Sequence, residues 1–210
     1  MEFGGVADGG GLELRREDNG GVRLSGRFHY NSPAVLSDGG RKGRPVKEQI
    51  APGAFDYTID EPDTDIHFLA GHSFDKVLAS KKSGTMTFRK TAGALIIAAY
   101  ITPAILRASY AQDAVAQVEA GLATGLSPGF RLPPERAVPR EEAESLEDEE
   151  YRPEEGMHRA IIRTIKQAIL VEMSTVVRPV YKDATVEAVR SWDKQRSLIV
   201  PKRSIQRWRA

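Results

Sequence analysis

The sequence predicts an α+β fold, built mainly from antiparallel strands in a barrel-like sheet that helices flank. Three observations lead to this prediction: short apolar or alternating segments recur along the chain, one long segment has a helical apolar face, and strand and helix patterns do not alternate regularly. The 210 residues, of which 40% are hydrophobic and 28% charged, fit one soluble domain with tails.

The elements follow from local pattern. Residues 22–30 alternate apolar and polar side chains, as a half-buried strand does. The segment from Thr102 to Gly121 begins with a helix-start signal, carries an apolar face and ends at glycine. In chain order we expect a strand at 22–30, a polar loop at 31–47, a short helix ending at Ile59, strands at 66–71, 86–90 and 95–101, a helix at 102–121, a strand at 124–132, and strands between 159 and 177.

The domain plan has a core at residues 20–182. Residues 1–19 begin with a glycine-rich stretch and are expected to be disordered, and residues 183–210 are expected to form a short helix and a basic tail. Within the core, residues 134–158 include a stretch at 141–155 with nine acidic side chains and one arginine. Such dense like charge repels itself and stays solvated, which predicts a disordered inserted loop.

Composition excludes several classes of protein. Thirty basic and twenty-nine acidic side chains give a net charge of +1, which argues against a dedicated nucleic-acid binder. Cysteine is absent, so disulfides, thiolate nucleophiles and cysteine-based zinc sites are excluded. Neither a membrane-length apolar run nor a signal-peptide pattern is present, which predicts a soluble, cytoplasmic protein. The sequence has no metal-ligand, phosphate-loop or dinucleotide motif, so we expect no metal and no cofactor.

The candidate catalytic groups are therefore hydroxyls, lysines and carboxylates. A catalytic serine needs a base, normally histidine, and the chain has four histidines. His67 and His72 flank the end of an expected strand, which leads into a loop at 73–75. A histidine at a strand end can turn toward a partner, although for either one taken alone a surface or capping role is the more common explanation.

Ser127 lies in an unusual segment, Gly125 to Phe130, with glycines on both sides of a small hydroxyl. The segment matches the G-x-S-x-G elbow of α/β-hydrolases. We reject that fold because the chain is short, because His158 is the one downstream histidine, and because Pro128 has no N–H for the oxyanion hole. A β-bulge or barrel corner with a buried serine is the structural alternative.

Four blocks in order then resemble a known family. They are Ala51-Pro52-Gly53-Ala54-Phe55, the segment 68–78 around His72, the segment 121–130 around Ser127, and Leu170-Val171-Glu172-Met173-Ser174 followed by Arg178-Pro179. Their order is similar to that of the tailed-bacteriophage prohead maturation proteases, serine proteases with a herpesvirus-assembly-protease-like fold. The resemblance covers about residues 20–185.

The resemblance implies a triad in which Ser127 is the nucleophile, His72 the general base and Glu172 the residue that orients the base. His67 is the alternative third member, since herpesvirus relatives use a second histidine. Taken alone, Glu172 is also compatible with an outward-facing strand residue. The family usually has a β-branched residue where this chain has Pro128, so Gly129 N–H and the Arg131 side chain become the oxyanion candidates.

The function that the resemblance implies is a serine endopeptidase of phage capsid maturation. Its substrates would be the scaffold, or the N-terminal region of the major capsid protein, and the protease itself. It would act inside the immature capsid in the bacterial cytoplasm, without a membrane or a specific nucleic acid, and a homo-oligomer is compatible with it. The alternatives are a catalytically inactive scaffold or capsid-binding protein of the same fold, and an unrelated barrel-like binding domain.

Overall fold

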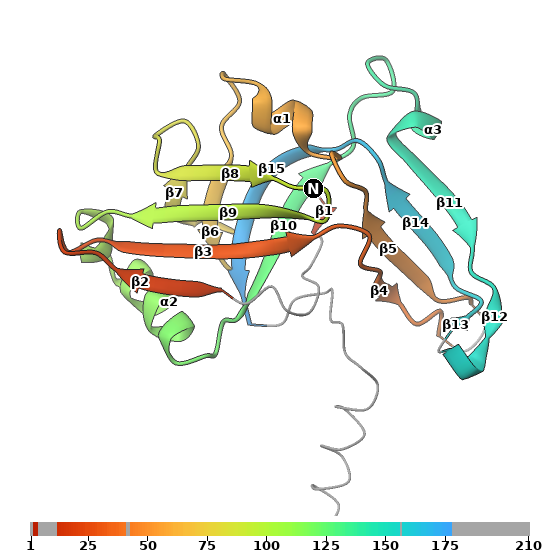
Figure 1. Ribbon diagram of the computed structural model, residues 1–210, viewed down its shortest axis with the longest axis horizontal. Helices are drawn as coiled ribbons and strands as arrows, with labels where there is room; N and C mark the ends of the chain where they lie inside the picture. The colour runs from red at the N-terminus through yellow and green to blue at the C-terminus, as the bar shows by residue number, and fades with distance from the viewer. Residues whose placement is uncertain (1, 4–11, 41–42, 156, 178–210) are drawn as a thin grey trace, which may run out of the picture.

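Two β-sheets face each other across an apolar core, and a third sheet projects to one side of them (Figure 1). The computed structural model describes residues 2–3, 12–40, 43–155 and 157–177 of the chain. The first sheet has the order β1 (Glu2–Phe3), β10 (Gly125–Arg131), β15 (Ile169–Val176), β6 (His67–Ala70) and β7 (Ser73–Ser80). The second has the order β2 (Glu13–Arg16), β3 (Val22–His29), β9 (Ala94–Ile101) and β8 (Met86–Lys90).

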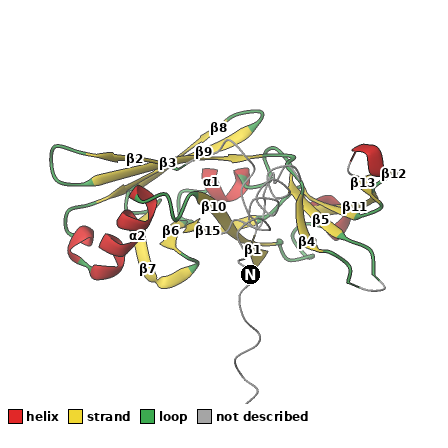
Figure 2. Cartoon of the chain, turned by 90° about the horizontal axis from the view of Figure 1, so that it is seen from below, coloured by secondary structure: helices red, strands yellow, loops and turns green. Residues whose placement is uncertain are grey.

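The third sheet, which we call the wing, has the order β11 (Glu144–Asp148), β14 (Ile161–Ile165), β5 (Val46–Ile50) and β4 (Ala34–Ser37). A small hairpin of β12 (Tyr151–Arg152) and β13 (Met157–His158) extends from it (Figure 2). The helical elements are α1 (Asp56–Asp60), η1 (Ile105–Arg107), α2 (Ser109–Glu119), α3 (Arg140–Ala143) and η2 (Pro153–Glu155).

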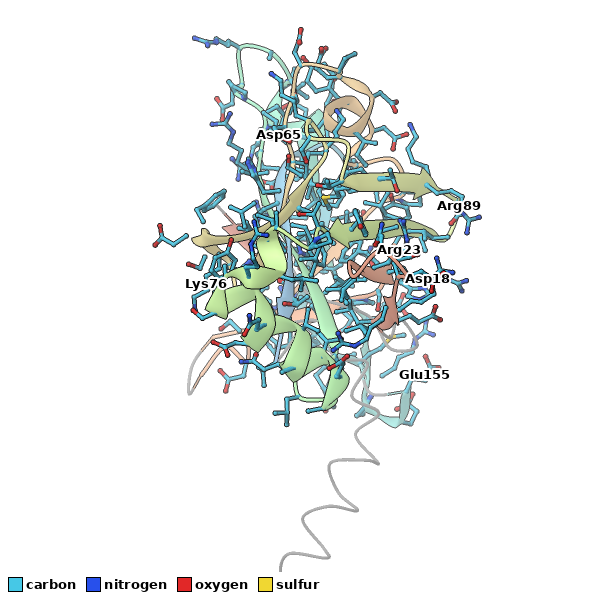
Figure 3. The ribbon with its side chains drawn as sticks, turned by 90° about the vertical axis from the view of Figure 1, so that its left-hand side faces the viewer. Asp18, Arg23, Asp65, Lys76, Arg89 and Glu155 are labelled. Carbon is cyan, nitrogen blue, oxygen red and sulfur yellow. The ribbon has the colours of Figure 1, made fainter. Side chains whose placement is uncertain are left out.

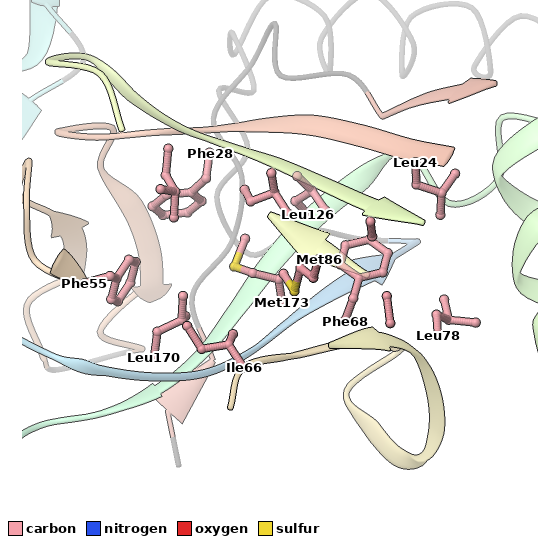
Figure 4. Close-up of a cluster of buried hydrophobic side chains, with 14 of the residues drawn as sticks. Leu24, Phe28, Phe55, Ile66, Phe68, Leu78, Met86, Leu126, Leu170 and Met173 are labelled. Atoms are coloured by element: carbon pink, nitrogen blue, oxygen red, sulfur yellow. The ribbon is translucent and has the colours of Figure 1, made fainter. Parts of the chain in front are cut away.

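The core lies between the first two sheets (Figure 4). Leu24 and Phe28 of β3 meet Leu126 of β10 and Met173 of β15 there, and all four are buried. On the outside, Arg89 of β8 and Lys76 of β7 are exposed to solvent, and the partly exposed Arg23 of β3 pairs with Glu17 (Figure 3). Charged side chains thus stay hydrated while alternate strand positions bury apolar surface, which is the main stabilising term.

Most strand pairs are antiparallel, as the sequence predicts, with parallel pairs at β15–β6 and β14–β5. The expected barrel is wrong for the described residues, because no closed barrel forms. Strands β5 and β14 pair with each other in the wing, and the two facing sheets keep open edges at β7 and β8.

The predicted helix over 102–121 forms in two pieces. Thr102 Oγ1 accepts the Ile105 N–H and starts the short turn η1, and then Ala108 is extended, with ψ 136°, before α2 begins. Gly121, with φ +67°, ends α2 where expected: its N–H bonds Val118 O, and the Leu122 N–H bonds Gln117 O. This bonding pattern is that of a Schellman cap.

Several expected loops contain strands. Residues 31–47 hold β4 and the start of β5, the expected loop at 73–75 begins β7, and β2 lies inside the stretch 1–19 that was expected to be disordered. Hydrogen bonds to a neighbouring strand order these segments, and local composition does not reveal such pairing. The predicted helix and tail at 183–210 lie outside the described residues.

The acidic segment 134–158 is also not a featureless loop, since it forms α3, β11, β12, η2 and β13. Its charges are matched by cations that are distant in sequence. Arg163 of β14 bonds Glu144 at 2.6 Å and the buried Glu48 of β5 at 2.9 Å, and Lys47 of β5 bonds Glu149. Burial alone would raise the pKa of Glu144, but hydrogen bonds from Arg163 and Arg140 outweigh it and lower that pKa.

Arg163→Met should therefore destabilise the fold by about 3–5 kcal/mol, because it leaves two buried carboxylates without their shared cation. Urea unfolding at neutral pH measures the change. The difference in unfolding free energy between Arg163→Met and wild type should narrow as the pH falls below 4.5, the ordinary pKa of Glu144. Folding lowers the pKa of this carboxyl, so its ionised form stabilises the fold above pH 4.5, and this contribution is lost once the carboxyl is protonated.

Arg16→Met is the matched control, because the ion pair of Arg16 with Glu119 is largely exposed. We expect it to change stability by less than about 1 kcal/mol. Equal effects of the two substitutions would contradict a stabilising role for the buried network.

Candidate functional site

The face of the first sheet that points away from the core carries polar side chains from three adjacent strands. Cross-strand partners share a face, and Ser127 pairs with Ser174, Gly129 with Glu172, and His67 with Glu172. The intervening residues, among them Leu126 and Met173, belong to the core cluster. One sheet therefore presents an apolar face to the core and a polar face on its other side.

A β-bulge in β15 makes this division possible. The register shifts between the pairs Gly129–Glu172 and Phe130–Leu170, so that Val171 has no direct partner. Leu170 and Met173 both lie in the core although they are three residues apart, a spacing that regular alternation would send to opposite faces. The extra residue turns Glu172 onto the polar face, as bulges beside functional sites often do.

His72 occupies a two-residue turn between β6 and β7. Gly71 and His72 both have positive φ, +62° and +60°, and Ala70 pairs with Ser73 across them. Two positive φ values in a two-residue hairpin are the requirement of a type I′ turn. Glycine adopts this conformation freely, whereas for His72 it is a strained one that the surrounding contacts must hold.

Those contacts connect His72 to β15. The Nδ1 atom of His72 lies 2.6 Å from Glu172 Oε1, and the backbone N–H of His72 donates to Ser174 Oγ at 3.0 Å. Because an ionised carboxylate only accepts, the neutral imidazole carries its proton on Nδ1, and Nε2 is the nitrogen that can take a proton. Glu172 is 0% exposed and the His72 side chain 22% exposed, so the pair extends from the protein interior to its surface.

Ser127 lies on the same polar face, directly opposite Ser174. Such cross-strand partners have Cβ atoms about 4.5–5.5 Å apart, and Ser174 contacts both His72 and Glu172. The three residues of the predicted triad are therefore gathered around one buried serine. Ser127 is 1% exposed, which favours small reactants over bulky ones in the conformation described.

The two oxyanion candidates lie further along β10. Gly129 is packed against the acid, because a Cβ added to it would lie 2.0 Å from Glu172 Oε1. Its lack of a side chain thus provides the space for the carboxylate, a role the sequence did not reveal. Arg131 is exposed and four residues from Ser127, about 13 Å along an extended strand, which disfavours it as a donor. Pro128 pairs with Met173 on the core face, away from Ser127.

His67, the alternative third member, makes other contacts. Its Nε2 lies 3.5 Å from Asp65 Oδ2, and its ring meets the Phe74 ring edge-on at 6.0 Å between centroids. Its buried Nδ1 has no hydrogen-bond partner among the described residues. The geometry therefore favours Glu172 over His67 as the partner of the His72 imidazole.

A pocket of about 390 Å³ opens beside His72. Ala70, Ala114 and Val176 line it with apolar groups, and Lys76, from β7, and Gln117, from α2, line it with polar ones. Since His72 is itself a lining residue, the pocket adjoins the turn between β6 and β7.

Within the described ranges, no group of three or more potential ligands is arranged to hold a metal ion. No helix there is long and apolar enough to cross a membrane.

Comparison with known proteins assigns the chain to a family. The model of a family described as caudovirus prohead serine protease matches residues 11–197, most of the sequence. The chain belongs to this family, as the four sequence blocks predict, and membership supports a role in capsid maturation. No curated protein and no solved structure matches it, so the herpesvirus-protease-like fold stays a prediction.

Gly129→Ala tests the packing of the acid. The added methyl group would lie 2.0 Å from Glu172 Oε1, so it should displace the carboxylate from His72 and lower the rate of Ser127 labelling by a fluorophosphonate at least about tenfold, the effect of losing roughly 1.4 kcal/mol of a charge-assisted hydrogen bond. Gly93→Ala is the control, because nothing lies within 4 Å of its added Cβ. Wild-type labelling of Gly129→Ala would contradict this role.

Proposed function

Since the chain is a member of the caudovirus prohead serine protease family, we infer that it is an endopeptidase with Ser127 as nucleophile, His72 as general base and Glu172 as the residue that orients the base. The observation that carries this proposal is the 2.6 Å contact between His72 Nδ1 and Glu172 Oε1, on the strand paired with that of Ser127. A histidine held by a buried carboxylate beside a serine has the arrangement needed for acyl transfer.

In the proposed reaction, Ser127 Oγ attacks the peptide carbonyl while its proton moves to His72 Nε2. Glu172 stabilises the imidazolium that forms, and the fixed Nδ1–H bond keeps the ring in the correct orientation. The imidazolium then protonates the leaving amine, and water hydrolyses the acyl-enzyme by the reverse route. Pro128 has no N–H, so Gly129 N–H remains the backbone candidate for holding the oxyanion.

The proposed substrates are the scaffold or the N-terminal region of the major capsid protein, together with the protease itself. The family description, a prohead protease, supports this substrate class and a location inside the immature capsid. A homo-oligomer is compatible with the proposal and is not needed for it.

A second candidate function is a catalytically inactive assembly protein of the same fold. The observation in its favour is the 1% exposure of Ser127, because a peptide could reach this hydroxyl only if the surrounding parts of the protein moved aside. The close His72–Glu172 contact favours the enzyme, since a purely structural protein has no need to hold histidine in a strained turn.

We further expect the pocket beside His72 to receive a medium-sized apolar side chain of the substrate next to the scissile bond. The apolar groups of Ala70, Ala114 and Val176 in its lining and its position beside the proposed base support this assignment. Gln117→Trp should obstruct the pocket and slow cleavage of capsid protein at least about tenfold, as the loss of roughly 1.4 kcal/mol of apolar contact would, while fluorophosphonate labelling of Ser127 stays near wild type.

Ala116→Trp is the matched control, because Ala116 is the preceding residue of α2, is exposed and does not line the pocket. If both tryptophan variants cleave at the wild-type rate, the pocket is not a substrate site.

Ser127→Ala tests the proposed function directly. The wild-type chain, co-expressed with capsid protein, should trim it and shorten itself, whereas Ser127→Ala should leave both intact, because removal of a triad member lowers kcat by about 10⁴-fold or more. Intact-protein mass spectrometry measures both products, and a fluorophosphonate adduct should map to Ser127.

Ser80→Ala serves as the control, since Ser80 is a buried serine at the far end of β7 whose hydroxyl bonds the Ser83 N–H. Trimming by Ser127→Ala would overturn the catalytic assignment, and an intact capsid protein with an unlabelled wild-type chain would favour the inactive assembly protein.

A further inference from the structure

Ser174 lies at the centre of the polar face and has no role in the proposed triad. It is 0% exposed, and its hydroxyl makes hydrogen bonds in two directions. The Oγ–H donates to Glu172 Oε2 at 2.6 Å, and the Oγ lone pair accepts the backbone N–H of His72 at 3.0 Å. A single hydroxyl thus touches both the acid and the residue that carries the base.

The two carboxylate oxygens of Glu172 are divided between these partners. Oε1 meets His72 Nδ1 and Oε2 meets Ser174 Oγ, each at 2.6 Å. A carboxylate held at both oxygens cannot rotate about its terminal torsion without losing one of the bonds. Ser174 therefore determines which oxygen lies in line with the imidazole.

The second bond acts on the backbone of the turn. The backbone N–H of His72, a residue held in the left-handed conformation, donates to Ser174 Oγ. Its bond to Ser174 links the His72 backbone to β15, the strand that carries Glu172. Base and acid are thus located relative to each other by the same atom.

We propose that Ser174 is a positioning residue of the peptidase, which aligns Glu172 and anchors the His72 turn for catalysis. This inference rests on the proposed function. Ser127 and Ser174 are cross-strand partners, but the Ser174 hydroxyl donates its proton to Glu172, a carboxylate that is also bonded to His72. It acts through its neighbours and makes no bond to the substrate.

The test compares Ser174→Ala, Ser174→Cys and wild type in the full chain. Ser174→Ala should lower the maximal rate of fluorophosphonate labelling at Ser127 roughly 10- to 100-fold, the effect of losing a hydrogen bond to a charged group. The probe concentration for half-maximal rate should not change. Ser174→Cys retains a weak donor of similar size and should give an intermediate rate, which keeps the test valid if the alanine variant folds poorly.

Thr58→Val is the matched control for the loss of a buried hydroxyl. Thr58 is also buried and also bonds in two directions, to Ala168 O and from the Leu170 N–H, but away from the triad. Its removal should lower the unfolding temperature and leave the labelling rate near wild type. If Thr58→Val and Ser174→Ala slow labelling equally, Ser174 is merely structural and the proposal is wrong.

A readout independent of activity separates this proposal from the proposed function. The His72 Nδ1–H, bonded to a buried carboxylate, should give a downfield proton resonance that His72→Ala removes. In Ser174→Ala this resonance should move upfield or broaden through exchange, even if the wild-type chain proves inactive. An unchanged resonance together with wild-type labelling would overturn the positioning role, whereas an unlabelled wild-type Ser127 would overturn the proposed function alone.

Discussion

The buried carboxylate of Glu172 is the constraint on which the polar face depends. An ionised acid withdrawn from water destabilises the fold unless hydrogen bonds replace its hydration. Here His72 and Ser174 supply those bonds, one to each oxygen, and Gly129 leaves the space that the carboxylate fills. The buried acid therefore requires each of these residues, in addition to any part that they play in the proposed catalysis. The strained turn at His72 is held in the same way, because its N–H has a partner fixed on β15.

The first sheet separates stability from chemistry by the alternation of its strands. One face contributes Leu126, Phe130 and Met173 to the core, and the other holds the polar group. The bulge at Val171 lets β15 keep both Leu170 and Met173 in the core while Glu172 turns outward from it. A rigid apolar layer behind the polar face limits its movement, which is what a preorganised site requires.

Much of this arrangement could be predicted from the sequence, and the remainder depends on contacts between distant segments. Apolar alternation revealed β3, a short apolar segment revealed β9, and the family blocks pointed to His72, Ser127 and Glu172. Composition does not reveal the bulge, the positive φ of His72 or the space beside Gly129, because these features depend on how the strands pair. The spacing of Glu172 and Ser174, two apart in a strand, was the available signal for the positioning residue. The acidic segment was wrongly expected to be a disordered loop, because the basic side chains that pair with its carboxylates lie on other strands.

The register of β15 is fixed where the chain leaves the wing. Residues 166–168 connect β14 to β15, and each bonds to a neighbouring element: the N–H groups of Lys166 and Gln167 donate to Ala143 O, and that of Ala168 donates to Ala54 O. Because this connection is bonded both at Ala143 and at Ala54, a one-residue slip would break its hydrogen bonds. Because a one-residue slip would send Glu172 into the apolar core, this joint is what keeps the acid on the face where His72 meets it.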